Sequence, residues 1–309
     1  MLTFLNNHTI FHKSAHLLLV LFFSVTLNAS TSLIVLGSGT PNPDPDRYGS
    51  AYAVVVNDRA YLVDFGPGVV RRISAMSPSW GGEFPQLELQ NINHAFLTHF
   101  HSDHSGGLSD LILTPWVMGR DSELSLYGPK GLKDMAQNIT NAYSLDIDYR
   151  LNGTQPANSN GFISIVKEID VGSIYKDKNI EVVAFRNSHG DLYESYGYLF
   201  ITEDKKILFS GDTAISSSLK NHAKDLDILV HEVYSSEGFK FKTDDWKIYH
   251  QAHHTSSIDL GILANELKPA KLVASHILFW GASEESVIKD IELNFKGEVV
   301  LASDLLVID

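Results

Sequence analysis

The stretch LTHFHSDHSGG, residues 97–107, follows an apolar run and places three histidines and one aspartate within six positions. In an extended chain alternate residues share a face, so His99 and His101 point the same way. A turn after them would bring Asp103 and His104 to a second position nearby. Imidazoles and a carboxylate without thiolates suit zinc, with manganese or iron as alternatives. The stretch therefore predicts two ligands for each of two metal ions.

Later strand ends supply the remaining candidate ligands: His189 follows VVAFRNS, Asp212 stands in FSGDT, and His276 follows KLVAS. An aspartate between two cations can bridge them with its two oxygens. A hydroxide held between the metals is the expected nucleophile, because two cations lower the pKa of bound water. The predicted first metal takes His99, His101 and His189, the second takes Asp103, His104 and His276, and Asp212 joins both.

The amino-acid composition indicates the class of protein. The chain has 309 residues, of which 44% are hydrophobic and 20% charged, as in a soluble globular protein. A formal net charge of −13 argues against a broad nucleic-acid-binding surface. The sequence contains no cysteine, so a metal site has to rely on histidine and carboxylates.

The first 29 residues have the layout of a secretory signal. Lys13 precedes an apolar core at 17–25, and small residues then favour cleavage after Ala29. The core is shorter than the roughly 20 residues needed to span a bilayer, so no stable membrane anchor is expected. These features predict a leader at 1–29, a hydrolase domain at 30–309, and a periplasmic or secreted protein.

From residue 33 onward strand-like and helix-like segments alternate without an obvious repeat. The hairpins and the mixture of elements favour an α+β fold of two sheets with helices outside, and not a doubly wound parallel sheet. The polar, turn-rich segment 150–180 reads as an excursion within one domain. Strands are expected within 33–40, 51–56, 60–66, 92–99, 125–129, 180–189, 195–213, 228–233 and 271–277, and helices within 107–118, 131–143, 216–227 and 255–267.

The run H-x-H-x-D-H at 99–104, the later His189, the GDT aspartate and the final His276 together resemble the metallo-β-lactamase fold superfamily. The resemblance covers essentially all of residues 31–309. It implies an αββα sandwich of two mixed sheets flanked by helices. It also implies a site for two Zn²⁺ at the edge of the sheets, with the ligand roles given above.

Local strings narrow the branch. LGSGTPNPDPDRYGSAYAVVV (36–56), YLVDFGPGVVRR (61–72) and VHEVY (230–234) are similar to ribonuclease Z and its secreted arylsulfatase-like relatives. The resemblance implies that Glu232 and His254 form a pair that helps protonate the leaving group. An alternative is that His253 and His254 begin the helix near 255. Asp103 is included with this pair among the expected catalytic residues.

Three functions remain open. The leader, the acidic balance and the short segment between His189 and Asp212 disfavour transfer RNA, so the first choice is an exported arylsulfatase acting on sulfate esters. The alternatives are a phosphodiesterase with a ribonuclease Z-like site lacking the RNA-binding arm, then a lactonase or β-lactamase. The expected partner is a small ester, not nucleic acid, and a homodimer is left open. Four aromatic residues are expected either in an aromatic pocket or in the core: Phe100, Trp116, Tyr193 and Trp280. No role is assigned to the other histidines, which are His8, His12, His16, His94, His222, His250 and His253.

Overall fold

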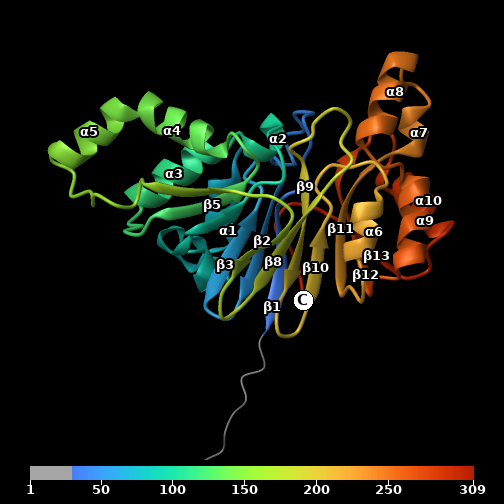
Figure 1. Ribbon diagram of the computed structural model, residues 1–309, viewed down its shortest axis with the longest axis horizontal. Helices are drawn as coiled ribbons and strands as arrows, with labels where there is room; N and C mark the ends of the chain where they lie inside the picture. Colours follow the sequence, from blue (N-terminus) through green and yellow to red (C-terminus); the bar gives the residue numbers. More distant parts are fainter. Residues whose placement is uncertain (1–29) are drawn as a thin grey trace, which may run out of the picture.

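The computed structural model describes residues 30–309, so the predicted leader lies outside the described residues. Two seven-stranded sheets form the centre of the molecule (Figure 1). The first sheet has the order β14 (Leu306–Ile308), β1 (Thr31–Gly37), β2 (Ala51–Val56), β3 (Arg59–Val63), β4 (His94–Phe96), β5 (Leu124–Gly128), β6 (Ser164–Glu168). The second has the order β13 (Glu298–Leu301), β12 (Lys271–Leu278), β11 (Ile228–Tyr234), β10 (Lys206–Phe209), β9 (Tyr196–Ile201), β8 (Glu181–Arg186), β7 (Gly172–Lys176).

Helices cover the outer faces of both sheets, which confirms the predicted αββα sandwich. The first sheet packs on α1 (Val69–Met76), α3 (Leu108–Val117) and α4 (Leu132–Ala142), and the second on α6 (Ser217–His222), α9 (Ser257–Leu267) and α10 (Glu284–Glu292). The remaining helices are α2 (Ser102–Ser105), α5 (Ser144–Asn152), α7 (Ser236–Phe239), α8 (Asp244–His253) and three short 3-10 turns at Pro78–Trp80, Pro85–Leu87 and Leu89–Asn91.

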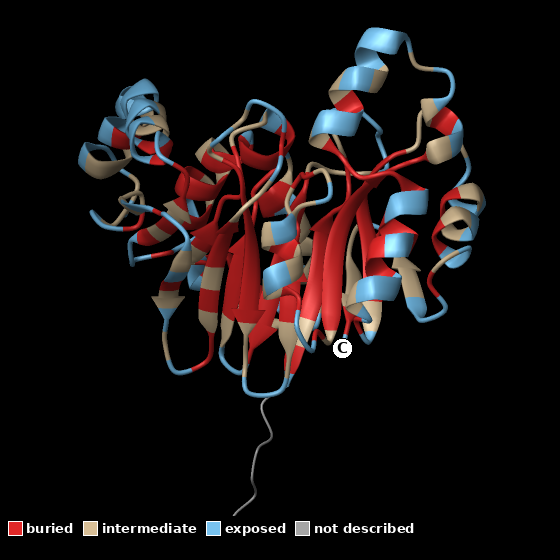
Figure 2. Ribbon diagram, turned by 45° about the vertical axis from the view of Figure 1, so that its right-hand side comes forward, coloured by how far each residue is buried: buried red, intermediate tan, exposed pale blue. Residues whose placement is uncertain are grey.

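Three apolar layers hold the sandwich together. The middle layer lies between the sheets and joins residues such as Val54 and Phe96 of one sheet to Val182 and Phe200 of the other. Each outer layer lies between one sheet and its helices. The central strands are therefore buried on both faces (Figure 2). This explains the near-continuous apolar runs in β2 and β11.

The segment 150–180 differs from its prediction as a turn-rich excursion. It contains β6 and β7, which are the outermost strands of the first and second sheet, respectively. Residues between these strands therefore carry the chain from one sheet to the other. Both strands are short and largely polar or half-exposed, because edge strands bury little side-chain area. That polarity is why their sequence resembles loops.

The carboxyl ends of the parallel strands of both sheets meet at one edge of the sandwich. Strands β3, β4 and β5 are parallel in the first sheet, and β10, β11 and β12 are parallel in the second. The short helix α2 lies at this edge (Figure 1). In parallel sheets functional side chains gather where the strands end. Within residues 30–309, none of the helices has both the length and the apolar character that a membrane crossing needs.

Candidate metal centre and its pocket

The opening histidine stretch leaves β4 earlier than predicted. The strand ends at Phe96, and the chain then continues in irregular conformation into α2. Asp64 accepts a hydrogen bond from the backbone N–H of Thr98 at 2.8 Å, which replaces a ladder partner. Freed from the pleat, His99 and His101 can approach each other, and Nε2 of His99 lies 3.1 Å from Nδ1 of His101.

A first group of donors surrounds that contact. Nε2 of His189, which follows β8, lies 3.3 Å from Nδ1 of His101. The Oδ2 atom of Asp212, which follows β10, lies 3.7 Å from Nε2 of His99. One ligand atom from each of these four residues falls within 4.8 Å of the others, as a single metal ion requires.

A second group lies next to the first. Nε2 of His276 is 2.9 Å from Oδ2 of Asp103, and Nε2 of His104 is 3.5 Å from the same oxygen. The Oδ1 atom of Asp212 is 3.4 Å from Nε2 of His104 and 3.7 Å from Nδ1 of His276. Asp212 therefore turns one oxygen towards each group, and the structure brings the side chains of all seven predicted ligands together.

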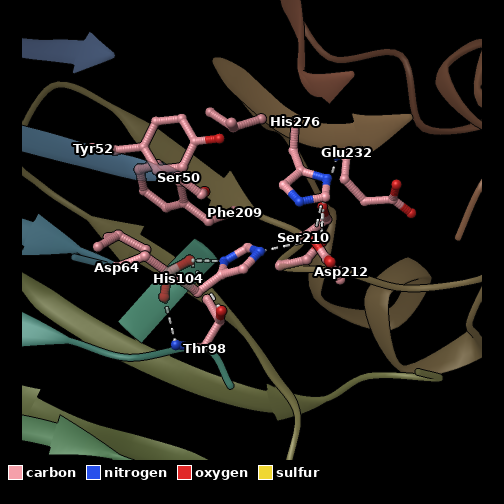
Figure 3. Close-up of a pocket in the computed structure, with 13 residues that line it drawn as sticks. Ser50, Tyr52, Asp64, Thr98, His104, Phe209, Ser210, Asp212, Glu232 and His276 are labelled. Atoms are coloured by element: carbon pink, nitrogen blue, oxygen red, sulfur yellow. Dashed lines mark hydrogen bonds and ion pairs between the residues drawn. The ribbon is translucent and has the colours of Figure 1, made fainter. Parts of the chain in front are cut away.

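Hydrogen bonds behind the ligands fix their tautomers. A carboxylate only accepts, so Nδ1–H of His104 donates to Asp64 at 2.8 Å (Figure 3). Nδ1–H of His189 likewise donates to the carbonyl of His253 at 2.8 Å. The Thr98 hydroxyl gives its hydrogen to Asp64, so it accepts from Nδ1–H of His99 at 3.0 Å. The rings of His99 and His189 thus leave Nε2 as a bare lone pair facing the centre, and His104 turns its Nε2 the same way.

These residues fit bound cations. Several buried polar atoms at the centre have no hydrogen-bond partner within the described chain, although buried polar atoms are nearly always paired. Imidazole nitrogens of His99 and His189 also lie within 3.3 Å of Nδ1 of His101, around a point that a cation could occupy. The unpartnered atoms are Oδ1 of Asp103, Nε2 of His104, Oδ1 of Asp212 and Nδ1 of His276.

Burial and charge prepare the ligands for metal. Burial lowers the pKa of His189 to about 4 and holds that of His99 well below its usual value, so both rings are neutral. At His104 burial opposes protonation, but the carboxylates of Asp212, Asp103 and Asp64 outweigh it and raise the pKa. Burial would raise the pKa of Asp212, yet the neighbouring His276 and His104 hold it well below its ordinary range.

Asp64 was missed in the sequence, although it lies in the quoted string YLVDFGPGVVRR. Its side chain is buried, and it binds Thr98 and His104 at once. Its backbone φ is +60°, a left-handed value that non-glycine residues seldom adopt. An aspartate directly after an apolar strand and before a glycine was the available signal.

His276 also has an unusual backbone. It lies within β12 at φ +46°, where the pairing with β11 shifts register next to Glu232. Such a bulge re-aims a side chain without ending the strand. Figure 3 shows the His276 ring turned towards Asp212. The bulge therefore delivers the last ligand to the edge.

The predicted pair of Glu232 and His254 is in contact. Nδ1 of His254 lies 3.3 Å from Oε2 of Glu232, while Oε1 of Glu232 accepts the backbone N–H of Thr255 at 2.8 Å. The helix α8 ends at His253, His254 follows it in extended conformation, and α9 begins only after Ser256, so the alternative that His253 and His254 start a helix is wrong. Burial lowers the pKa of His254 to about 4 and raises that of Glu232, to which Asp212 adds repulsion.

A pocket of about 430 Å³ opens onto the second donor group. One side, here called the donor wall, consists of His101, Asp103, Asp212, His254 and His276. The other side, here called the aromatic wall, consists of Trp246, Tyr249, His250 and Trp280, with Lys242 beside them.

The aromatic wall corrects several sequence expectations. Of the four predicted pocket aromatics only Trp280 lines this pocket. Trp116 is buried core, and Phe100 packs against the same core layer. Tyr193 is exposed and carries the Arg186 guanidinium over its ring.

The histidines that received no role lie in different environments. His250, expected at the surface, is 7% exposed in the aromatic wall, because the helix α8 that carries it was not predicted. His94 is half-buried against Tyr61 and Tyr175. His222 stacks on Phe185. His253 supplies the carbonyl that orients His189, a role of its backbone that no residue-type pattern reveals. His8, His12 and His16 lie outside the described residues.

Comparison with known proteins places the chain. Residues 31–262 match the family model described as Anti-Pycsar protein Apyc1. Ribonuclease Z of Mycobacterium bovis is 29% identical over 204 residues, which is 65% of this chain and 69% of that protein.

Solved structures agree on the fold. The metallo-β-lactamase fold protein YhfI of Bacillus subtilis superposes with a TM-score of 0.69 at 16% identity, covering 90% of this chain and 98% of that one. The short form of human tRNase Z superposes with a TM-score of 0.65 at 22% identity, with the same coverages. The chain is a metal-dependent hydrolase of the metallo-β-lactamase fold, on its ribonuclease Z-like branch, and belongs to the Anti-Pycsar protein Apyc1 family.

Proposed function

We propose that this hydrolase is a phosphodiesterase for small phosphodiesters and that its two donor groups hold two zinc ions. The observation that carries the proposal is the position of Asp212, with one oxygen towards each donor group at the floor of a pocket of about 430 Å³. Nitrogen-rich donor sets without thiolate favour zinc, and manganese and iron remain the alternatives. When bound, two such ions would activate water and stabilise negative charge on the phosphoryl oxygens.

The protein's own groups supply the proton for the leaving oxygen. Burial disfavours the charged forms of both Glu232 and His254, so their shared proton lies on the carboxyl of Glu232. Nε2–H of the neutral His254 can donate to the leaving oxygen as the phosphorus–oxygen bond breaks. Nδ1 then takes the proton from Glu232 across the 3.3 Å contact. A general acid of this kind matters most for a poor leaving group such as an alkoxide.

The phosphodiester alternative is favoured over the arylsulfatase that the sequence put first. Two of the named relatives, ribonuclease Z and tRNase Z, are ribonucleases, whose substrate bond is a phosphodiester, whereas none of the named relatives is a sulfatase. A small substrate is favoured over RNA by two features. Between His189 and Asp212 the chain forms only the β9–β10 hairpin, and the net charge of −13 repels a polyanion.

Hydrolysis of bis-p-nitrophenyl phosphate beside p-nitrophenyl sulfate tests the function, with purified protein loaded with zinc. We expect a clear preference for the phosphodiester, lost on chelation and restored by metal. A preference for the sulfate would return the arylsulfatase to first place. Chelator-resistant turnover of either ester would contradict the metal centre.

Export is a separate proposal that rests on the leader alone, since the relatives give no support for an exported role. Residues 1–29 carry the whole argument. Amino-terminal sequencing of protein recovered from cell fractions and medium tests it. A mature chain beginning at Ser30 outside the cytoplasm supports export, and an intact leader on cytoplasmic protein refutes it.

A further inference from the structure

The aromatic wall carries the ammonium group of Lys242. Nζ of Lys242 lies 4.2 Å from the centre of the Trp280 ring, a cation–π contact. Among residues 30–309 this ammonium makes no hydrogen bond or ion pair, and its contact is with the face of the ring. Lys242 is half-buried and lines the pocket.

The ring beneath that ammonium is fixed from behind. Trp280 belongs to an aromatic cluster in which Tyr234 lies 5.6 Å and His250 lies 4.4 Å from it, centre to centre. His250 is 7% exposed, and its Nδ1 atom is buried without a hydrogen-bond partner in the described chain. These neighbouring rings hold the Trp280 face in place beneath the ammonium.

The two walls of the pocket carry charges of opposite sign. The donor wall contains the carboxylates of Asp103 and Asp212, which the metal ions would neutralise. Lys242 is the one lysine or arginine among the residues that line the pocket. In a chain with a net charge of −13, such a cation attracts an oxygen acceptor into the pocket.

We propose that Lys242, held on Trp280 beside His250, forms a subsite that binds an oxygen acceptor on the non-leaving arm of the substrate. The preferred arm is a flat ring that bears a carboxylate or a carbonyl group. The ring packs against the aromatic wall, and the ammonium donates to the oxygen. This subsite rests on the proposed phosphodiesterase function and specifies which phosphodiesters fit.

Three p-nitrophenyl phosphodiesters test the subsite, because they share one leaving group and differ only in the other arm. The arms are phenyl, 4-carbamoylphenyl and 4-carboxyphenyl. We expect kcat/KM to rise in that order for the unaltered protein, mainly through KM. In Lys242→Met the preference for carboxyphenyl over phenyl should fall about tenfold, as expected for one charge-assisted hydrogen bond.

Lys240→Met is the matched control, since Lys240 is exposed two residues away and does not line the pocket. It should keep the preference of the unaltered protein. A preference that is unchanged in Lys242→Met, or equally reduced in Lys240→Met, would overturn the subsite.

Binding separates the subsite from the reaction. Quenching of tryptophan fluorescence by 4-carboxyphenyl phosphate, measured with metal-free and zinc-loaded protein, needs no turnover. Binding that weakens about tenfold in Lys242→Met supports the subsite even if no phosphodiester is hydrolysed, in which case only the proposed function fails. Equal binding to both proteins would reject the subsite whatever the activity.

Discussion

The two walls of the pocket are built in different ways. The donor wall comes from strand ends, the short helix α2 and the residue that follows α8, and four of its five residues are buried; His101 is partly exposed. The aromatic wall comes from α8 and the turn after β12, and its Trp246 is 53% exposed. Contacts of His254 with Glu232 and of His276 with Asp103 hold the donor wall, whereas ring contacts hold the aromatic wall together. Rigid sheet edges thus carry the chemistry, and a peripheral helix shapes selectivity.

Asp212→Asn should break the donor wall most severely. The amide keeps the size of the side chain but removes the charge that faces both donor groups. We expect kcat/KM to fall by roughly 10³-fold or more, because metal-assisted stabilisation amounts to several kcal/mol. Steady-state kinetics with metal analysis by mass spectrometry measures the effect. Two metals per chain with near-normal activity would refute the bridging position.

His254→Ala should produce the next largest effect, and it should depend on the leaving group. A general acid contributes roughly 10²-fold for a poor leaving group and much less for p-nitrophenolate, which leaves without a proton. Rates across a series of phosphodiesters with leaving groups of rising pKa measure this. A uniform loss across the series would assign His254 to structure or binding. Metal content, which should stay unchanged, serves as the control.

The contrast between the walls also explains what the sequence revealed. One short string contains four of the predicted ligands: His99, His101, Asp103 and His104. The other three were predicted because a histidine or an aspartate follows a strand at each of these positions. The chemistry required those residue types, so the pattern was readable. The two-sheet architecture followed from the resemblance to the metallo-β-lactamase fold, whereas the order of the strands was not predicted. The edge strands β6 and β7 escaped prediction because exposed strands lose the apolar alternation that marks a strand.

Most of the aromatic wall could not be predicted from the sequence, for a physical reason. Trp246, Tyr249 and His250 lie on α8, whose sequence DDWKIYHQAH has no clear apolar stripe because only His250 is buried. Any aromatic residue serves equally well in a core or in a pocket wall, so type alone could not separate Trp280 from Trp116. Asp64 was hidden for another reason, since its role depends on a left-handed backbone and on partners 34 and 40 residues away.

Asp64→Asn tests whether the two donor groups owe their order to the residues behind them. The amide can still accept from one neighbour, but it lacks the charge that favours Nδ1–H on His104. We expect metal affinity to fall 10- to 100-fold, the usual range for groups that orient a ligand. Competition with a chromogenic chelator measures the affinity. The midpoint of thermal unfolding is the control, because a large drop would signal lost folding instead of lost orientation.

The smallest expected effect concerns the aromatic wall and acid. Burial, with repulsion from His254 and Lys242, lowers the pKa of His250 to about 4 in the folded protein, below its ordinary value of 6.5. Folding therefore favours the neutral ring, and the stability that it contributes is complete above pH 6.5 and is lost as pH falls towards 4. Between pH 7 and pH 5 the loss should be about 1 kcal/mol after allowing for solvent screening.

His250→Phe should remove that part of the pH dependence, because phenylalanine cannot take up a proton. Urea unfolding of both proteins at pH 7 and pH 5, with chelator present to remove any metal contribution, gives the difference directly. The variant should lose about 1 kcal/mol less than the unaltered protein over this interval. Identical losses would mean that the aromatic wall is open enough to water for His250 to titrate normally. The rings of the aromatic wall would then be packed less tightly than the contacts of Trp246 and Trp280 with His250 indicate.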